Sequence, residues 1–386
     1  MASTGYCFKI GLLLLTTVFF IVSPVFASAP APGMAAADSV DLSQLNSFLK
    51  TLDQETQRLL PKLDLKSWGL TGPDWDFGKI GKDIAGYFLR ELIFNLRLMG
   101  ELLLLAMALA ILQNMRHAFA GETVSQIAFG ICFLVMMGLV ANSFKFTFLI
   151  ARDALAQMTN FMYSIIPLLF SLIAAGGGVT TTAIVHPLLI STIGLMGGLM
   201  NNLIFPLILF AGVLGMVNFL VDGFQISGLA NFFKTAALGL MGLAMAVFIG
   251  IITIRGFAAS IADSTALRTA KYLTTTFLPV VGGALSDTVE MAAGCSVILK
   301  GGLGIFGLGV VVLITVFPLM KILAVAVVYQ LTGAVAQPLG KEFRIAEALQ
   351  TVGGTFLNIF GAVAVVGLMF FISLAILVGV AYIKVF

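Results

Sequence analysis

Lys321 is the residue whose type and position point most directly to chemistry. It lies within an apolar run from Leu303 to Val335. An ionisable side chain within a membrane helix is expected to face a water-filled cavity or an opposite charge, because an ammonium in hydrocarbon is costly. If Pro318 breaks the helix, however, Lys321 lies just past the break and its side chain could extend to the membrane surface. The sequence leaves both interpretations open.

Prolines within the apolar runs form a second set of candidate residues. Four share an apolar–Pro–apolar pattern and are predicted to break helices or line a cavity: Pro167, Pro206, Pro279 and Pro318. Proline lacks a backbone N–H, and irregular backbone at membrane depth is tolerated only inside protein or beside a cavity. Asn201 and Asn202 precede Pro206 by four to five residues. They are predicted to cap or bridge the broken helix, with a role between helices as the alternative.

The sequence contains no convincing motif for catalysis. It has no GxxxxGK[ST] phosphate loop, no HExxH zinc motif and no GxSxG nucleophile motif. His117 and His186 are isolated from any cysteine or carboxylate cluster, and the three cysteines lack the spacing of a metal site or a disulfide framework. We therefore predict a non-enzymatic protein without a cofactor or bound metal. No basic stripe with interleaved aromatics is present, which argues against a nucleic-acid partner.

Composition indicates a protein that lies mostly within the lipid bilayer. Of 386 residues, 60% are hydrophobic and 10% charged, whereas about a quarter are charged in soluble domains. We predict an all-α polytopic membrane bundle with about seven crossings. The apolar runs cover residues 92–112, 124–144, 161–175, 183–221, 235–258, 303–335 and 351–383. The runs 183–221 and 303–335 exceed one straight crossing, so they are predicted to break near Pro206 or the Gly197–Gly198 pair, and near Pro318.

The chain divides into three predicted regions. Residues 1–27 are typical of a secretory signal peptide, with an uncleaved anchor as the alternative. Residues 28–90 are predicted to form an extracytoplasmic segment, and residues 91–386 the polytopic membrane domain. Within the segment, residues 40–60 have the apolar spacing of an amphipathic helix that Pro61 ends. Its apolar face could pack on the membrane body, lie among lipid head groups or bind a partner. Trp68 and Trp75 are expected at the membrane surface.

The matched prolines also suggest an internal duplication. Pro167 and Pro206 are 39 residues apart, as are Pro279 and Pro318, and the second pair follows the first by 112 residues. At that displacement Phe205–Leu207 aligns with Phe317–Leu319. The predicted repeats are residues 152–256 and 264–380, with paired helix breaks facing each other across the repeat interface.

Several stretches resemble the stage III sporulation protein AE family of endospore-forming bacteria. They are Arg268–Lys271 followed by FLPVVGGALSD (Phe277–Asp287), FPLMKILAVAVVYQL (Phe317–Leu331), AVAQPLG (Ala334–Gly340), GLANFFKT (Gly228–Thr235) and GGVTTTAIVHPLL (Gly177–Leu189). The resemblance extends over roughly residues 88–386. It rests on the number and order of these strings, since none has a chemical mechanism of its own.

The resemblance implies a multi-pass protein of the mother-cell membrane around the forespore. Family members work with other membrane proteins of the same complex in a secretion-like channel required for sporulation, and self-association stays open. The family has no established catalytic residues, so none is assigned. The alternative is a self-contained secondary transporter with a substrate site between two repeats. Such a transporter should carry polar side chains at that interface, where only Lys321, Asn201 and Asn202 are evident.

Overall fold

The computed structural model describes residues 42–61, 73–118, 122–218, 226–277, 282–339 and 344–382, and every regular element in these ranges is a helix. Two short helices, α2 (Ser43–Leu49) and α3 (Gln54–Leu59), come first. The body consists of α5 (Phe77–Phe94), α6 (Leu96–Ala118), α7 (Glu122–Ala175), α8 (Val179–Leu199), α9 (Phe205–Val217), α10 (Ser227–Phe277), α11 (Gly282–Ala336) and α12 (Arg344–Tyr382). A π-helical segment, η2 (Met200–Ile204), joins α8 to α9, and a short 3-10 turn, η3 (Gln337–Leu339), follows α11.

Six helical segments of the described residues are long and apolar enough to cross a bilayer: Gly78–Leu112, Ile127–Ala175, Val179–Val217, Ser227–Arg255, Leu299–Ala336 and Ile345–Gly379. The predicted polytopic helical bundle is therefore confirmed, with six candidate spans in the described part of the chain where about seven crossings were expected. The difference arises because the runs at 124–144 and 161–175 belong to one helix, α7. Residues 145–160 between them contain charges but no Gly or Pro, so nothing interrupts the helix.

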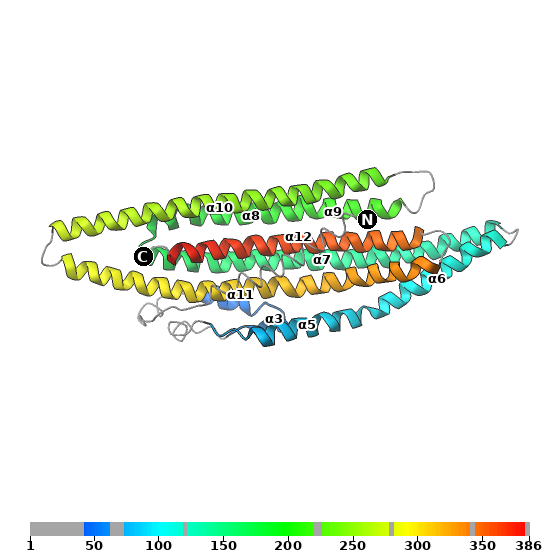
Figure 1. Cartoon of the computed structure of the whole chain (residues 1–386), viewed down its shortest axis with the longest axis horizontal. Helices are drawn as coiled ribbons and strands as arrows, with labels where there is room; N and C mark the ends of the chain where they lie inside the picture. The colour runs from blue at the N-terminus through cyan, green and yellow to red at the C-terminus, as the bar shows by residue number, and fades with distance from the viewer. Residues whose placement is uncertain are drawn as a thin grey trace.

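The long helices exceed the thickness of a bilayer. α7 has 54 residues and α11 has 55, which correspond to about 80 Å each, whereas the hydrocarbon core is about 30 Å thick. The α6–α7 and α10–α11 hairpins project at opposite ends of the bundle (Figure 1). A straight α7 therefore cannot lie wholly within hydrocarbon.

α11 and α12 form the most extensive helix pair, and α12 also packs against α7, α9 and α10. Small residues permit close approach along this pair. A side chain at Gly367 would collide with Thr315, and one at Gly304 would collide with Val378. Large aromatic side chains fill the interior and are fully buried: Phe161, Phe205, Phe306, Phe356 and Phe370. Dispersion contacts between such groups stabilise membrane helices, which lack a strong hydrophobic drive to associate.

Two of the predicted helix breaks are not breaks. Pro167 lies inside α7 and Pro318 lies inside α11, and both helices continue past the proline. Each proline removes a single backbone hydrogen bond, and neighbouring helices can hold the two sides in line. Pro279 lies outside the described residues, so the match of Pro167 with Pro279 is not tested. The duplication remains a prediction.

The N-terminal segment differs from the single amphipathic helix predicted over residues 40–60. It forms α2 and α3, with a turn at residues 50–53 between them. Local side-chain bonds favour this turn, because Gln57 Nε2 donates to the carbonyls of Lys50 and Leu52 at 3.0 and 2.7 Å. The apolar face packs on the body: Leu45 is 1% exposed, and the Phe48 ring lies 5.6 Å from the Phe161 ring of α7. The signal peptide, residues 1–27, lies outside the described residues.

Candidate functional site

The predicted break near Pro206 takes the form of a π-helical turn. Proline cannot donate a backbone hydrogen bond, and the preceding residues adopt the wider turn η2. Asn201 is half-buried and Asn202 exposed within η2. The Asn201 Nδ2 donates to Asn202 Oδ1 at 3.4 Å. π-turns and prolines both redirect helices, and here the turn lies within one helical span, Val179–Val217, without interrupting it.

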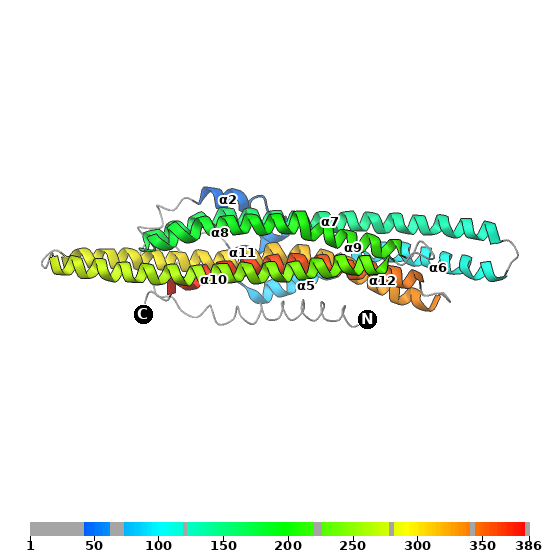
Figure 2. The ribbon, with the colours of Figure 1, turned by 90° about the horizontal axis from the view of Figure 1, so that it is seen from above.

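The direction of the chain changes at η2. α8 packs against α7 and α10, whereas α9 packs against α10 and α12, and Figure 2 shows α9 diverging from α7 toward α10. A groove of about 490 Å³ opens between α7 and α9. Its lining is Met137, Ala141, Phe144, Lys145, Phe148, Leu149, Leu209, Val213, Met216 and Val217. Lys145 is the one charged residue of this lining.

Lys321 is half-buried on α11 and does not line this groove. α7 and α12 lie between α11 and the α8–α9 pair (Figure 1). The fold therefore does not bring Lys321 together with Asn201 and Asn202 at a shared repeat interface. Pro318 lies one turn before Lys321 in the same continuous helix.

The N-terminal segment covers α11 close to Lys321. The Tyr87 ring of α5 meets the Phe317 ring edge-on at 4.9 Å, and Met320 belongs to the same buried cluster. Trp75 lies against Phe306 and Gly309, where only glycine leaves room for its ring, and its position at the membrane surface stays a prediction. Trp68 lies outside the described residues. The predicted boundary between residues 90 and 91 falls within α5.

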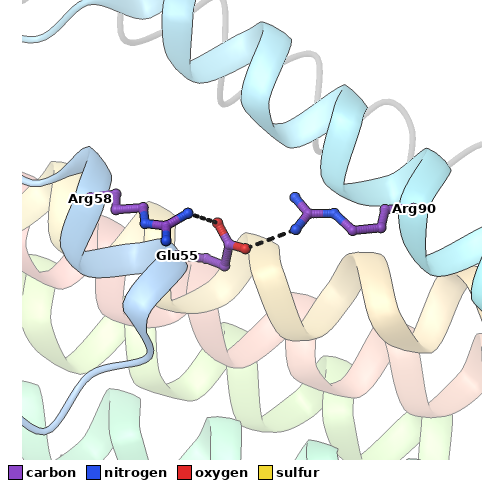
Figure 3. A network of polar contacts seen from close by, with 3 residues as sticks. All are labelled: Glu55, Arg58 and Arg90. Atoms are coloured by element: carbon purple, nitrogen blue, oxygen red, sulfur yellow. Dashed lines mark hydrogen bonds and ion pairs between the residues drawn. The ribbon is translucent and has the colours of Figure 1, made fainter.

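A small polar network connects α3 to α5 within the N-terminal segment (Figure 3). Arg90 Nη1 of α5 donates to Glu55 Oε1 of α3 at 3.1 Å, and Arg58 Nη1 lies 3.9 Å from Glu55 Oε2. Arg90 and Arg58 side chains are largely exposed. Exposed ion pairs contribute at most about 1 kcal/mol, so apolar packing against α7 and α11 is the main attachment of α2 and α3.

One face of α7 carries a series of exposed polar side chains within the apolar bundle. Asn142, Lys145, Arg152 and Asn160 are exposed at intervals of three, seven and eight residues, and Asp153 adjoins Arg152. Such intervals place side chains on the same side of a helix. The Arg152 guanidinium lies over the Phe148 ring at 6.0 Å. Sequence reasoning missed this face because it treated α7 as two separate crossings.

The buried carboxylate of Asp263 binds the first turn of α8, directly after the α7–α8 connection. Asp263 of α10 is 1% exposed, and its two oxygens accept from the backbone N–H groups of Thr180 and Thr181 at 2.8 and 3.0 Å. An acidic group at a helix N-terminus satisfies unpaired donors and favours the helix dipole. The preceding turn uses Gly177, whose φ of 84° favours glycine. Asp263 and Thr180 are 83 residues apart in the sequence, so no local sequence pattern predicts this contact.

Sequence comparison relates this chain to a known protein family. The family model for stage III sporulation protein AE matches residues 70–381. Stage III sporulation protein AE of Bacillus subtilis (strain 168) is 34% identical over 297 residues, which cover 77% of this chain and 74% of that protein. No solved structure matches. With a family match over most of its length and a relative of this similarity, the chain belongs to the stage III sporulation protein AE family and has a role in sporulation.

Proposed function

We propose that this chain is a non-enzymatic, multi-pass membrane subunit of a secretion-like channel between the mother cell and the forespore. In this proposal it lies in the mother-cell membrane around the forespore, with residues 28–90 on the extracytoplasmic side. Its partners are other membrane proteins of the same sporulation complex. The polar face of α7 is the part of the chain that contacts the aqueous path.

The observation that carries this proposal is the exposure of Lys145, Arg152, Asp153 and Asn160 on a helix that is apolar enough to span a membrane. A charged side chain at the bilayer centre costs about 2.5–3.5 kcal/mol on insertion scales. Where this face of α7 lies at membrane depth, several such groups are therefore costly against lipid. Water or a polar partner beside that face removes the cost.

The packing of the interior supports a subunit over a self-contained transporter. A transporter needs polar groups that converge between its helices. The interior of the described residues is instead mostly aromatic and aliphatic, including Phe161, Phe205 and Phe356, and its buried polar groups are spread over several helices. The polar face of α7 points outward from the single chain, so an aqueous path along it needs a second wall. Another subunit supplies that wall in this proposal.

Sporulation assays of matched substitutions test the proposal. Arg152→Leu and Asn160→Leu, expressed as the sole copy in a sporulating host, should insert at normal abundance but lower spore yield at least tenfold. Arg255→Leu is the control, because Arg255 is an exposed arginine on a different helix, α10. Spore yield and protein level are measured in the same cultures. Normal spore yield for both α7 variants at normal abundance would reject a role for this face.

A further inference from the structure

The groove between α7 and α9 has the composition of a lipid site. Nine of its ten lining residues are apolar, and Lys145 supplies one ammonium. The groove reaches the surface, since Leu149 and Val213 in its lining are 47% and 41% exposed. Phe144 and Met216 are buried and form part of its floor. An amphiphile would meet an apolar channel with a single cationic position.

The groove has the dimensions of a small-molecule site. Its α7 wall runs from Met137 to Leu149, which is about 18 Å of helix. The groove measures about 490 Å³, within the range of roughly 300–1,000 Å³ typical of small-molecule sites. An acyl chain lying along α7 suits this length and volume.

The positive charges beside the groove indicate which kind of amphiphile it would bind. Arg152 follows Lys145 by two turns and lies over the ring of Phe148, which lines the groove. Among the described residues neither cation forms an ion pair. Asp153 is the neighbouring acid, and it does not line the groove. Two cations beside an apolar channel complement a phosphate that carries a net negative charge, as basic pockets between membrane helices do.

We propose that this groove binds one anionic phospholipid. An acyl chain lies along α7 and α9, and the phosphate contacts Lys145 and Arg152. The site exists because η2 and Pro206 turn α9 away from α7. It requires that the groove lies in the membrane with Lys145 and Arg152 at head-group depth, and it does not rest on the proposed aqueous path, which is tested by spore yield and not by lipid binding.

Native mass spectrometry of the purified full-length protein in detergent tests this proposal. The probes are dioleoyl phosphatidylglycerol and dioleoyl phosphatidylcholine, which share acyl chains and differ in head-group charge, with glycerol 3-phosphate as a phosphate without a chain. We expect one phosphatidylglycerol to bind at least fivefold more tightly than phosphatidylcholine, and no binding of glycerol 3-phosphate. Equal binding of the two lipids, or binding of glycerol 3-phosphate alone, would overturn the proposal.

Substitutions then locate the binding. Lys145→Gln and Arg152→Gln should each weaken phosphatidylglycerol binding about fivefold, which corresponds to about 1 kcal/mol per basic side chain, and leave phosphatidylcholine binding unchanged. Val213→Trp fills the groove and should reduce binding of both lipids. Arg255→Gln on α10 is the charge-matched control and should bind as the parent does.

Each variant is first compared with the parent by gel filtration and thermal unfolding. Should Lys145→Gln not fold, Arg152→Gln decides the question, because Arg152 lies outside the groove lining. Unchanged phosphatidylglycerol binding in a folded glutamine variant, or in folded Val213→Trp, would place the lipid elsewhere and contradict the proposal.

Discussion

The two halves of α7 share one continuous helix but expose different chemistry. Within residues 127–141 every exposed side chain is apolar, and Ile127, Ile131, Leu134 and Val135 are 52–65% exposed. From Asn142 onward the exposed face carries amide and charged groups, with Phe146 and Leu149 exposed near the junction. The first half therefore matches a lipid surface, and the second matches a surface in contact with water or a polar partner.

This difference shows that a helix can be continuous while its surroundings change along it. Helix continuity depends on backbone propensity, and neither half contains a residue that ends the helix. Pro167 near the end of α7 is tolerated as well. Whether a half of α7 matches lipid or water depends instead on its exposed side chains. The groove that holds Lys145 in its lining lies at the junction between the two halves.

The largest expected effect comes from placing a charge on each half in turn. Leu134→Arg introduces a cation on the lipid-facing half, which costs about 2.5–3.5 kcal/mol at the membrane centre, and should lower the amount of inserted protein severalfold. Ala156→Arg places the same cation at an exposed position of the polar half and should leave abundance unchanged. Quantitative immunoblots of membrane fractions measure both. Equal losses would remove the distinction between the halves.

A smaller effect is expected where the polar half of α7 ends. Asp263→Ala removes the acceptor of the Thr180 and Thr181 N–H groups and should lower the unfolding free energy by about 1.5–3 kcal/mol. Asp263→Asn keeps one acceptor oxygen and should cost less. Thermal unfolding of the purified protein in detergent measures the two changes. An unchanged stability in Asp263→Ala would show that the contact does not hold α8 in place.

The junction itself contains a buried hydrogen bond. The Tyr329 hydroxyl of α11 donates to Ser143 Oγ of α7 at 2.8 Å. Tyr329→Phe should therefore cost about 0.5–1.5 kcal/mol of stability, and combining it with Ser143→Ala should add little, because the pair is already broken. A double-mutant cycle by thermal unfolding checks this. Fully additive losses would mean that the two hydroxyls act independently.

The smallest effect is expected at Lys321. This lysine is half-buried on α11 and does not line the groove between α7 and α9, and its ammonium can extend to an interface. Lys321→Leu should leave both protein level and spore yield near normal. Loss of spore yield at normal protein level would instead place the aqueous path beside α11 and support the cavity interpretation of this residue.

The sequence predicted the fold class well because composition and apolar runs report burial in lipid directly. It predicted about seven crossings against six candidate spans among the described residues, because the polar face of α7 looked like a loop between two runs. It predicted a break near Pro206 or the Gly197–Gly198 pair, and the structure has a π-helical turn just before Pro206 within one helical span. It predicted helix breaks at Pro167 and Pro318 that the structure does not have. The packing of neighbouring helices decides whether a proline ends a helix.

The candidate site was predictable only in part, because it also depends on contacts between helices that are distant in the sequence. Asn201 and Asn202 were identified beside Pro206, but the groove that opens there depends on how α9 packs against α10 and α12. Asp263 escaped notice because its partners are 82 and 83 residues away. Extending the helical spacing of Lys145, Arg152 and Asn160 across the two apolar runs would have revealed the polar face.

A cysteine-accessibility scan of α7 in intact membranes tests the central claim most directly. Single cysteines at Asn142, Asp153 and Asn160, and at Ile127, Ile131 and Val135, are introduced in a background without native cysteines. Each is treated with a charged, membrane-impermeant thiol reagent applied to both sides of the membrane. The account predicts rapid labelling at the three polar positions and protection at the three apolar ones. Equal labelling of the two sets, or labelling of the apolar set alone, would contradict it.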